Sequence, residues 1–242
     1  MYLTHPPTAD MQLGCDHPCF GCPVRDLAVC NALSQGELGQ FRRNGSTRRL
    51  SQGEALCWQG EIAGCVYSLV KGVLRFSKVL VDGRRQVTGF AFPGDFIGVT
   101  LEDEHPFTAE AVSEVELCQF SRGRFDAFVE AHPHMERRLY SAAASELAAA
   151  RDQVVLLGRK TAAERIASFL LQMARHTCQV PDGPLRVDLP MSRMDIADYL
   201  GLRIETVSRE LSALKASGLI RMTGVHELQI RGVEELECRA AA

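Results

Sequence analysis

The cysteines carry the most reactive side chains of this chain, and four of them lie in one stretch near the N-terminus. Cys15, Cys19, Cys22 and Cys30 lie within sixteen residues. The proline and glycine residues between them discourage regular helix or strand, so the stretch can bury little apolar surface. Thiolates do bind soft metal ions and iron–sulfur clusters strongly. Three interpretations compete, a four-thiolate zinc site, a disulfide and an iron–sulfur cluster, and the stretch alone ranks zinc first and the cluster second.

The cysteine total argues against a disulfide framework. The chain has nine cysteines, an odd number that cannot all pair within one molecule. The first eleven residues are polar and lack the apolar core of a secretory signal, so we expect a cytoplasmic, reducing compartment. A cysteine-rich segment there favours metal or redox chemistry. No run of about 18 apolar residues occurs, so no membrane span is expected.

A second group of residues with functional side chains lies near the C-terminus. Glu205, Ser208 and Arg209 stand at i, i+3 and i+4, and so share one face of a helix. An arginine can donate two hydrogen bonds to guanine O6 and N7, and a carboxylate can accept one from a base amino group. The simpler interpretation is a surface ion pair between Glu205 and Arg209, worth about 0.3–0.5 kcal/mol. We favour DNA reading, because the surrounding helix pattern agrees with it.

Charge does not mark the whole chain as a nucleic-acid binder. The net charge is −3, although charge is unevenly placed: between Arg137 and Arg175 basic residues outnumber acidic ones by seven to three. A surface for DNA must therefore be local. An ordinary helical surface explains this local excess equally well.

The pattern of apolar residues and turns divides the chain into four parts that must position these groups. They are a cysteine-rich arm (1–32), an antiparallel β-roll (33–132), a long dimerisation helix (133–158) and a winged helix-turn-helix (159–242). In the roll, short alternating runs are separated by glycines, with a hairpin signal at Asp82-Gly83. Cys57 and Cys65 fall in these runs and are interpreted as small core residues. Cys118, taken alone, receives the same interpretation.

Hydroxyl side chains at three positions are expected to cap helices. Ser34, with Glu37 three residues later, forms a capping box before a helix that ends near Phe41. Ser121 is expected to cap residues 124–130, and Thr161 to cap residues 162–175.

The long helix carries an apolar stripe with alternating steps of three and four residues. The stripe consists of Tyr140, Ala143, Leu147, Ala150, Val154 and Leu157. That spacing is typical of a two-stranded coiled coil, whereas a helix that packs only on its own domain usually has a broader apolar face. We therefore expect a homodimer along this seam rather than packing within one chain.

Two short helices joined by a glycine turn surround the second group of residues. Ser192 and Asp195 cap the first helix, and Gly201 supplies the turn. The second helix places Val207, Leu211 and Leu214 on one face and the polar residues on the other. This arrangement is a helix-turn-helix, and residues 226–230 are expected to form a small wing.

This order of parts resembles the CRP/FNR superfamily of bacterial transcription regulators over nearly the whole chain. The most specific stretches are Leu156–Ala167 and Asp198–Arg209. The resemblance implies an α+β fold, in which an antiparallel β-roll with the cupin-like cyclic-nucleotide-binding fold precedes a long dimerisation helix and a winged helix-turn-helix.

Within the superfamily the chain is most similar to FNR-type oxygen sensors of the FnrN/FnrL-like variant. These hold a 4Fe–4S cluster with three N-terminal cysteines and one from the roll. The resemblance implies that Cys19, Cys22, Cys30 and Cys118 are the ligands, and that Cys15 is an extra cysteine. The seven residues between Cys22 and Cys30 are the longer of the family's gaps, which leaves the choice between Cys15 and Cys19 open.

The resemblance also assigns the DNA contacts. Glu205, Ser208 and Arg209 match the FNR-branch residues that recognise TTGAT-type palindromic half-sites, with Arg209 on guanine, Glu205 on amino groups and Ser208 on thymine. Thr206 lies in the same stretch. Arg203 stands where a capping hydroxyl is expected and would hold a backbone phosphate. Double-stranded DNA, a second copy of the chain and RNA polymerase, the last contacted through the hairpin at Asp82-Gly83, are the implied partners.

The implied mechanism is that cluster assembly pins the arm to the roll and favours the dimer, which oxygen then weakens. A cyclic-nucleotide sensor is disfavoured, because Glu102, Asp103 and Glu104 stand where a phosphate would bind. Haem sensing has only isolated histidines to support it. A zinc protein using the four N-terminal cysteines, with Cys118 in the core, stays open. No nucleophile–base set or nucleotide loop supports an enzyme.

Overall fold

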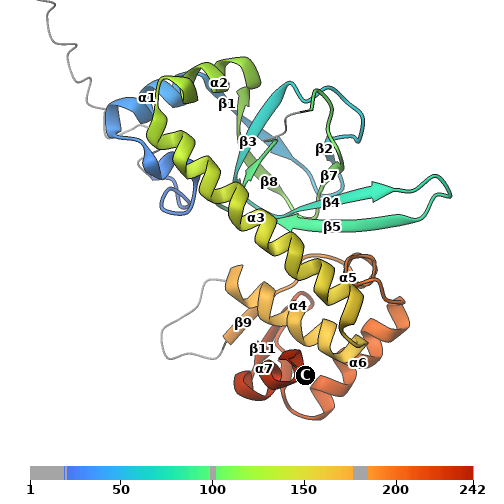
Figure 1. Ribbon diagram of the computed structural model, residues 1–242. Helices are drawn as coiled ribbons and strands as arrows, with labels where there is room; N and C mark the ends of the chain where they lie inside the picture. Colours follow the sequence, from blue (N-terminus) through green and yellow to red (C-terminus); the bar gives the residue numbers. More distant parts are fainter. Residues whose placement is uncertain (1–18, 20, 99–101, 177–184, 242) are drawn as a thin grey trace, which may run out of the picture.

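An antiparallel roll, one long helix and a helical C-terminal domain follow one another along the chain (Figure 1). This computed structural model describes residue 19 and residues 21–98, 102–176 and 185–241. The predicted α+β class, with a roll, a long helix and a C-terminal helix-turn-helix, is confirmed. The extra cysteine, Cys15, and His17 lie outside the described residues.

The segment after Cys22 is wound into turns before the first regular helix. The N–H groups of Leu27 and Ala28 both donate to the carbonyl of Val24, and a 3-10 turn, η1 (Val29–Ala32), follows. Helix α1 (Gln35–Arg43) then begins at Ser34. The Ser34 hydroxyl accepts from the N–H of Glu37, whose carboxylate accepts from the N–H of Ser34, so the predicted capping box is confirmed.

Within the described residues, eight strands build the roll as two four-stranded antiparallel sheets, in the orders β1-β8-β3-β6 and β2-β7-β4-β5. Their apolar residues, among them the fully buried Leu69, Leu74 and Leu117, pack in one core. Gly83 has φ +82° in the hairpin between β4 and β5, as the turn signal predicts. The strands are β1 (Gly45–Leu50), β2 (Ala55–Cys57), β3 (Cys65–Lys71), β4 (Leu74–Val79), β5 (Arg85–Ala91), β6 (Phe96–Ile97), β7 (Thr108–Ala111) and β8 (Val115–Ser121).

Two helices leave the roll, and the first differs from its prediction. Helix α2 (Arg122–Glu130) begins two residues earlier than expected, and the Ser121 hydroxyl makes no capping hydrogen bond. The prediction of a Ser121 cap was wrong, because Ser121 still pairs with Cys65 as the last residue of β8. The carbonyl of Gly64 instead accepts from the Arg122 N–H at 3.0 Å. The predicted long helix is present as α3 (Pro133–Arg159), with proline in its first turn.

The C-terminal domain packs helices against a three-stranded sheet in the order β10-β11-β9. Thr161 and Glu164 exchange capping hydrogen bonds before α4, which confirms that cap. The wing hairpin forms as predicted from β10 and β11. The elements are α4 (Ala162–His176), β9 (Leu185–Asp188), α5 (Arg193–Leu200), α6 (Ile204–Ala216), β10 (Ile220–Met222), β11 (Glu227–Ile230) and α7 (Val233–Ala241).

Candidate metal centre and nucleic-acid interface

Cys118 lies on β8, an inner strand of the roll. Its backbone pairs with Thr47 of β1 on one side and Ser68 of β3 on the other. Both neighbouring strands hold β8 in register, so the position of this thiol is fixed by the sheet. The Cys118 side chain packs against the apolar cluster that contains Phe41 and Phe120.

The arm brings its own thiols to the same apolar cluster. Cys19 and Cys30 pack against it with Cys118, and α1 supplies Leu38 and Phe41 to its interior. Cys22 is half-buried nearby, like the other three. The fold therefore gathers Cys118 with arm residues that lie more than eighty positions earlier in the chain. Cys57 is a buried core residue as predicted, whereas Cys65 is only partly buried against the same core and accepts a hydrogen bond from Gln119.

These thiols affect one another electrostatically. Burial raises the pKa of Cys30 to about 11, and charge repulsion from Cys22, Cys19 and Cys118 adds to this effect. Burial is also the main cause that raises the pKa of Cys19, with Cys118 next. Thiolates this close and this poorly solvated need a positive partner in order to ionise together, and a bound metal centre supplies one.

The thiols do not converge on a single point. Among the described residues, no three His, Cys, Asp or Glu side chains meet closely enough to hold one metal ion. A zinc ion needs every ligand about 2.3 Å from its centre. In a 4Fe–4S cluster each thiolate binds a different iron, so the ligands stand further apart. Within the described residues, the four half-buried thiols therefore do not form a closed site for a single ion.

The arm is also joined directly to the long helix. Arg138 of α3 donates from Nη2 to the carbonyl oxygen of Leu27 at 3.1 Å. Leu27 in turn packs on Gly94 of the roll, where a Cβ atom would lie 2.7 Å from the Leu27 Cβ. Gly94 also has φ +102°, so a larger residue is excluded there on two grounds. The loop between Cys22 and Cys30 thus touches the roll and α3 together.

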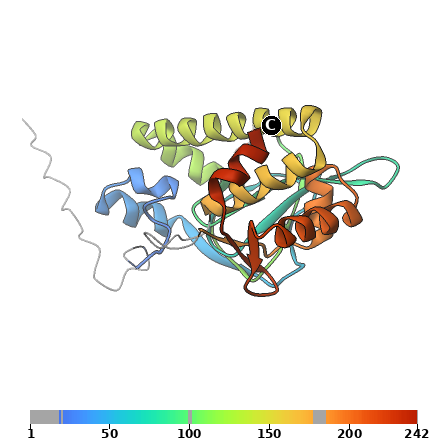
Figure 2. The same cartoon turned by 90° about the horizontal axis from the view of Figure 1, so that it is seen from below.

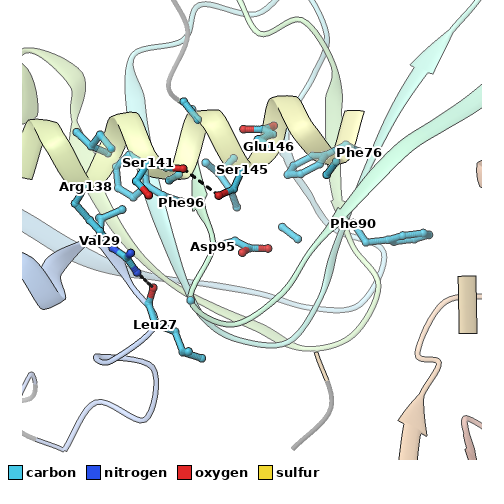
Figure 3. A pocket seen from close by; sticks show the side chains of 18 of the residues that line it. Leu27, Val29, Phe76, Phe90, Asp95, Phe96, Arg138, Ser141, Ser145 and Glu146 are labelled. Atoms are coloured by element: carbon cyan, nitrogen blue, oxygen red, sulfur yellow. Dashed lines mark hydrogen bonds between the residues drawn. The ribbon is translucent and has the colours of Figure 1, made fainter. Parts of the chain in front are cut away.

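A cavity of about 490 Å³ lies between the roll and α3 (Figure 3). Asp95 and Glu146 both line it. Burial raises the pKa of Glu146, and repulsion from Asp95 adds to the shift. Among the lining residues the one arginine is Arg138, which is engaged with Leu27. These carboxylates would repel the phosphate of a cyclic nucleotide. Glu102, Asp103 and Glu104, which were expected to stand where the phosphate would bind, are not among the residues that line this cavity.

The helix-turn-helix is formed by α5 and α6. Ser192 and Asp195 complete the predicted capping box at the start of α5, and Gly201 ends it in the left-handed conformation with φ +60°. In α6 the apolar residues Val207, Leu211 and Leu214 are buried, as predicted. Arg203 stands at the N-cap position and makes no side-chain cap.

The opposite face of α6 is open to solvent. Glu205, Ser208 and Arg209 are exposed, and Thr206 beside them is half-buried. The ion-pair partner of Arg209 is Glu210 at 3.5 Å, not Glu205. The surface pair between Glu205 and Arg209, considered as the simpler explanation of this triad, is therefore not the one that forms, and both side chains are exposed.

Two domains of the chain match known protein families. Residues 47–132 match the cyclic nucleotide-binding domain, and residues 164–239 match the Crp-like helix-turn-helix domain. Over 222 residues the chain is 43% identical to the nitrogen fixation regulation protein FixK of Bradyrhizobium diazoefficiens, which covers 91% of this chain and 94% of that protein. The chain belongs to the CRP/FNR family of transcription regulators. It is thus a DNA-binding regulator and not an enzyme, as predicted.

The chain is also similar to other CRP/FNR proteins over most of their length. The transcriptional activator protein FnrL of Cereibacter sphaeroides is 38% identical over 212 residues, with 86% of each chain covered. The solved structure of FixK2 from Bradyrhizobium japonicum is 37% identical and covers 82% of this chain and 98% of that one, with a TM-score of 0.76. In the part of the chain that the structure describes, no helix is long and apolar enough to cross a bilayer.

The seam expected to join two CRP/FNR protomers is uncovered in the single chain. Tyr140, Leu147 and Val154 are 77%, 53% and 71% exposed, and Ala143 and Ala150 are exposed with them. Figure 2 shows α3 along one edge of the molecule, with the roll and the C-terminal domain on its other side. Leu157, the last seam residue, packs partly against the C-terminal core.

One group of contacts had no signal in the sequence. Asp195 was predicted only as a helix cap, yet its carboxylate also binds Arg75 and Arg85 of the roll. The partners lie 120 and 110 residues away, and no local pattern reveals such a pairing. The same holds for Arg138 and Leu27, which are 111 residues apart.

Proposed function

We propose that this CRP/FNR protein is an oxygen-responsive regulator that holds a 4Fe–4S cluster with Cys19, Cys22, Cys30 and Cys118. In this proposal the cluster controls dimerisation, and the dimer binds TTGAT-type palindromic sites at low oxygen. The observation that carries the proposal is the meeting of the arm thiols with Cys118 at one apolar cluster. If Cys118 were only a core residue, its packing would not require the arm thiols beside it.

The chemistry of the four thiols supports a bound metal centre. Soft thiolates are the usual ligands of iron–sulfur clusters. Burial raises the pKa of Cys19, Cys30 and Cys118, so these thiols ionise together only beside a cationic centre. When bound, the cluster supplies the sensitivity to oxygen, because its oxidation weakens the bonds to the thiolates. The relationship to FnrL is consistent with this proposal.

The protein's own residues would carry the change to the dimer. Holding Cys19, Cys22 and Cys30 against Cys118 also fixes the loop that contains Leu27. Arg138 then anchors the first third of α3 to that loop by donating to the Leu27 carbonyl. Release of the arm removes this anchor just before Tyr140, where the seam begins. A change of about 3 kcal/mol in the dimer would alter its population more than a hundredfold.

Recognition of DNA would then rest on the exposed face of α6. In this proposal the exposed Arg209 exchanges its contact with Glu210 for two hydrogen bonds to a guanine, Glu205 accepts from amino groups, and Ser208 meets a thymine. Arg203 and Thr206, at the start of the helix, would contact the backbone phosphates. An exposed apolar hairpin tip, Leu80 and Val81 before Asp82-Gly83, is the surface we assign to RNA polymerase.

Iron and acid-labile sulfide analysis tests the cluster directly. We expect about four irons and four sulfides per chain in protein purified under argon. Cys118→Ala should lose most of both, because it removes the ligand that ties the arm to the roll. Cys238→Ala is the matched control, since this thiol is exposed on α7 and far along the chain.

The variants Cys15→Ala and Cys19→Ala, treated in the same way, decide which of the two is the ligand; we expect only the latter to lose iron. Full iron content in Cys118→Ala would contradict the proposal. So would wild-type protein that contains zinc in place of iron, which would favour the structural zinc site.

A further inference from the structure

The helix-turn-helix is held against the roll by a set of ion pairs between two strands and α5. The chain runs through the whole of α3 and α4 between these partners, and Figure 1 places α5 beside β5. Arg75 of β4 and Arg85 of β5 provide the cations, and Asp195 and Asp198 of α5 provide the anions. These four residues are called the clamp below.

The ion pairs of the clamp share partners: Asp195 binds both arginines, and each arginine binds two carboxylates. Arg75 donates from Nη1 to Asp195 and from Nη2 to Glu110 at 2.8 Å. Glu110 is the cross-strand neighbour of Arg75 on β7, so the sheet itself orients the guanidinium. Arg85 donates to Asp195 at 2.8 Å and reaches Asp198 with two nitrogens, at 2.6 and 2.9 Å. Such forked contacts fix orientation as well as distance.

Burial makes the clamp more than a surface feature. The Asp195 side chain is only 5% exposed and that of Arg75 16%. Burial acts to raise the pKa of Asp195, but hydrogen bonds from Ser192 and the charges of Arg75 and Arg85 outweigh it and hold the pKa below its usual range. A buried carboxylate with two cationic partners is costly to separate from them.

Uncharged contacts reinforce the same orientation. The Gln86 side chain donates to the backbone carbonyl of Asp198, and Gln153 of α3 donates to that of Tyr199 at 2.9 Å. The Phe90 and Tyr199 rings meet edge to face, with centroids 5.3 Å apart. The roll, α3 and α5 are therefore joined at one place.

The clamp leaves the DNA-reading face open. Asp195 and Asp198 approach the roll from α5, whereas Glu205, Ser208 and Arg209 are exposed on α6. Because α5 and α6 share a buried core through Ile196, Leu200 and Val207, fixing α5 also fixes α6. The roll can thus set the direction in which the reading residues point without touching DNA.

We propose that Arg75 and Arg85 are positioning residues for DNA recognition, which hold α6 at the angle that a palindromic site requires. The inference rests on DNA reading by α6 and is independent of the cluster. In a dimer, half-site spacing follows from the geometry of the two reading helices, which lie about 34–36 Å apart. Loss of the clamp lets each helix-turn-helix vary in orientation and should relax the preference for one spacing.

Spacing selectivity is the measurement that separates positioning from folding. The wild type, kept under argon, first selects an operator from a random duplex library. Affinities are then measured for this operator, for versions with one base pair added or removed between half-sites, and for a single half-site. The double variant Arg75→Gln/Arg85→Gln should lose at least about tenfold of the discrimination between spacings. Its affinity for the single half-site should change by less than about threefold.

Arg84→Gln is the matched control. Arg84 is adjacent to Arg85 but 77% exposed, and it pairs with Asp82 inside its own hairpin. We expect it to keep wild-type selectivity. Arg85→Lys is a milder variant that retains the charge and loses the forked contact with Asp198; it should lose a smaller part of the discrimination. Circular dichroism and thermal unfolding of each variant verify that the domains are folded.

Unchanged spacing discrimination in folded Arg75→Gln/Arg85→Gln protein overturns the proposal. Tighter operator binding by that variant overturns it as well, because the clamp would then hold an orientation that opposes DNA binding. A wild type that selects no sequence at all would refute sequence reading by α6 itself, a failure distinct from that of the clamp.

Discussion

Arg209 is the side chain whose chemistry is most specific on the exposed face of α6. Replacing it by lysine keeps the positive charge but removes the fork that can bind guanine O6 and N7 together. We expect Arg209→Lys to weaken binding to the preferred operator by about 1–3 kcal/mol and to relax selectivity at the guanine. Binding assays on operators with each base at that position measure the effect. Arg239→Lys, on α7 and paired with Glu235, should leave both properties unchanged.

Asp195 links stability to pH in a predictable direction. Its folded-state pKa lies below its usual value, so its stabilising charge is fully present above about pH 4, the unfolded value, and is lost as pH falls through the folded pKa. Asp195→Asn leaves Arg75 and Arg85 without this partner and should cost about 3–5 kcal/mol at pH 7.

The difference in unfolding free energy between Asp195→Asn and wild type should be constant from pH 8 to about pH 5 and shrink below about pH 4. Denaturant titrations at each pH measure it. Asp82→Asn, in an exposed pair with Arg84, should cost at most about 1 kcal/mol. A difference that instead grew in acid would mean that Asp195 is not held ionised by the clamp.

At the scale of elements, α3 joins the arm, the roll and the helix-turn-helix, and it presents an exposed apolar seam. Leu147→Glu places a carboxylate in the middle of that seam, where burial against a second chain would cost about 3 kcal/mol or more. We expect the dimer dissociation constant to rise at least about a hundredfold. Sedimentation of the protein under argon measures this change.

Ala148→Glu is the control for the seam. Ala148 is an exposed neighbour on the same helix, outside the three-four stripe, and should tolerate the charge with little effect on association. Equal dissociation in both variants would show that helix propensity or net charge, rather than the seam, determines assembly.

At the scale of the whole molecule, oxygen sensitivity depends on how strongly the seam holds without the arm. No charged side chain belongs to the stripe from Tyr140 to Leu157, although Glu146, Arg151 and Asp152 flank it. We therefore expect air exposure to dissociate the dimer only in part, less sharply than a seam with a buried charge would allow. Sedimentation of air-exposed protein that shows monomer alone would contradict this expectation.

Local sequence patterns were enough to predict most helices and strands, the group of arm cysteines and the polar group on α6. Capping boxes at Ser34 and Ser192, the Asp82-Gly83 hairpin and the glycine turn at Gly201 depend on residues a few positions apart, so the chain reveals them directly. Ser121 failed as a cap because the β8 partner strand, a long-range feature, already fixed its backbone.

The amino-acid sequence by itself determined the thiol-rich arm, the seam and the polar face of α6, since each follows from residue type and short spacing. The tertiary structure decided which roll residues meet them, although the family resemblance had already implied Cys118. It brought Cys118 to the arm thiols, Arg138 to Leu27, and Arg75 and Arg85 to Asp195. The physical reason is that sheet register and domain packing set these distances, and neither leaves a periodic trace in a single chain.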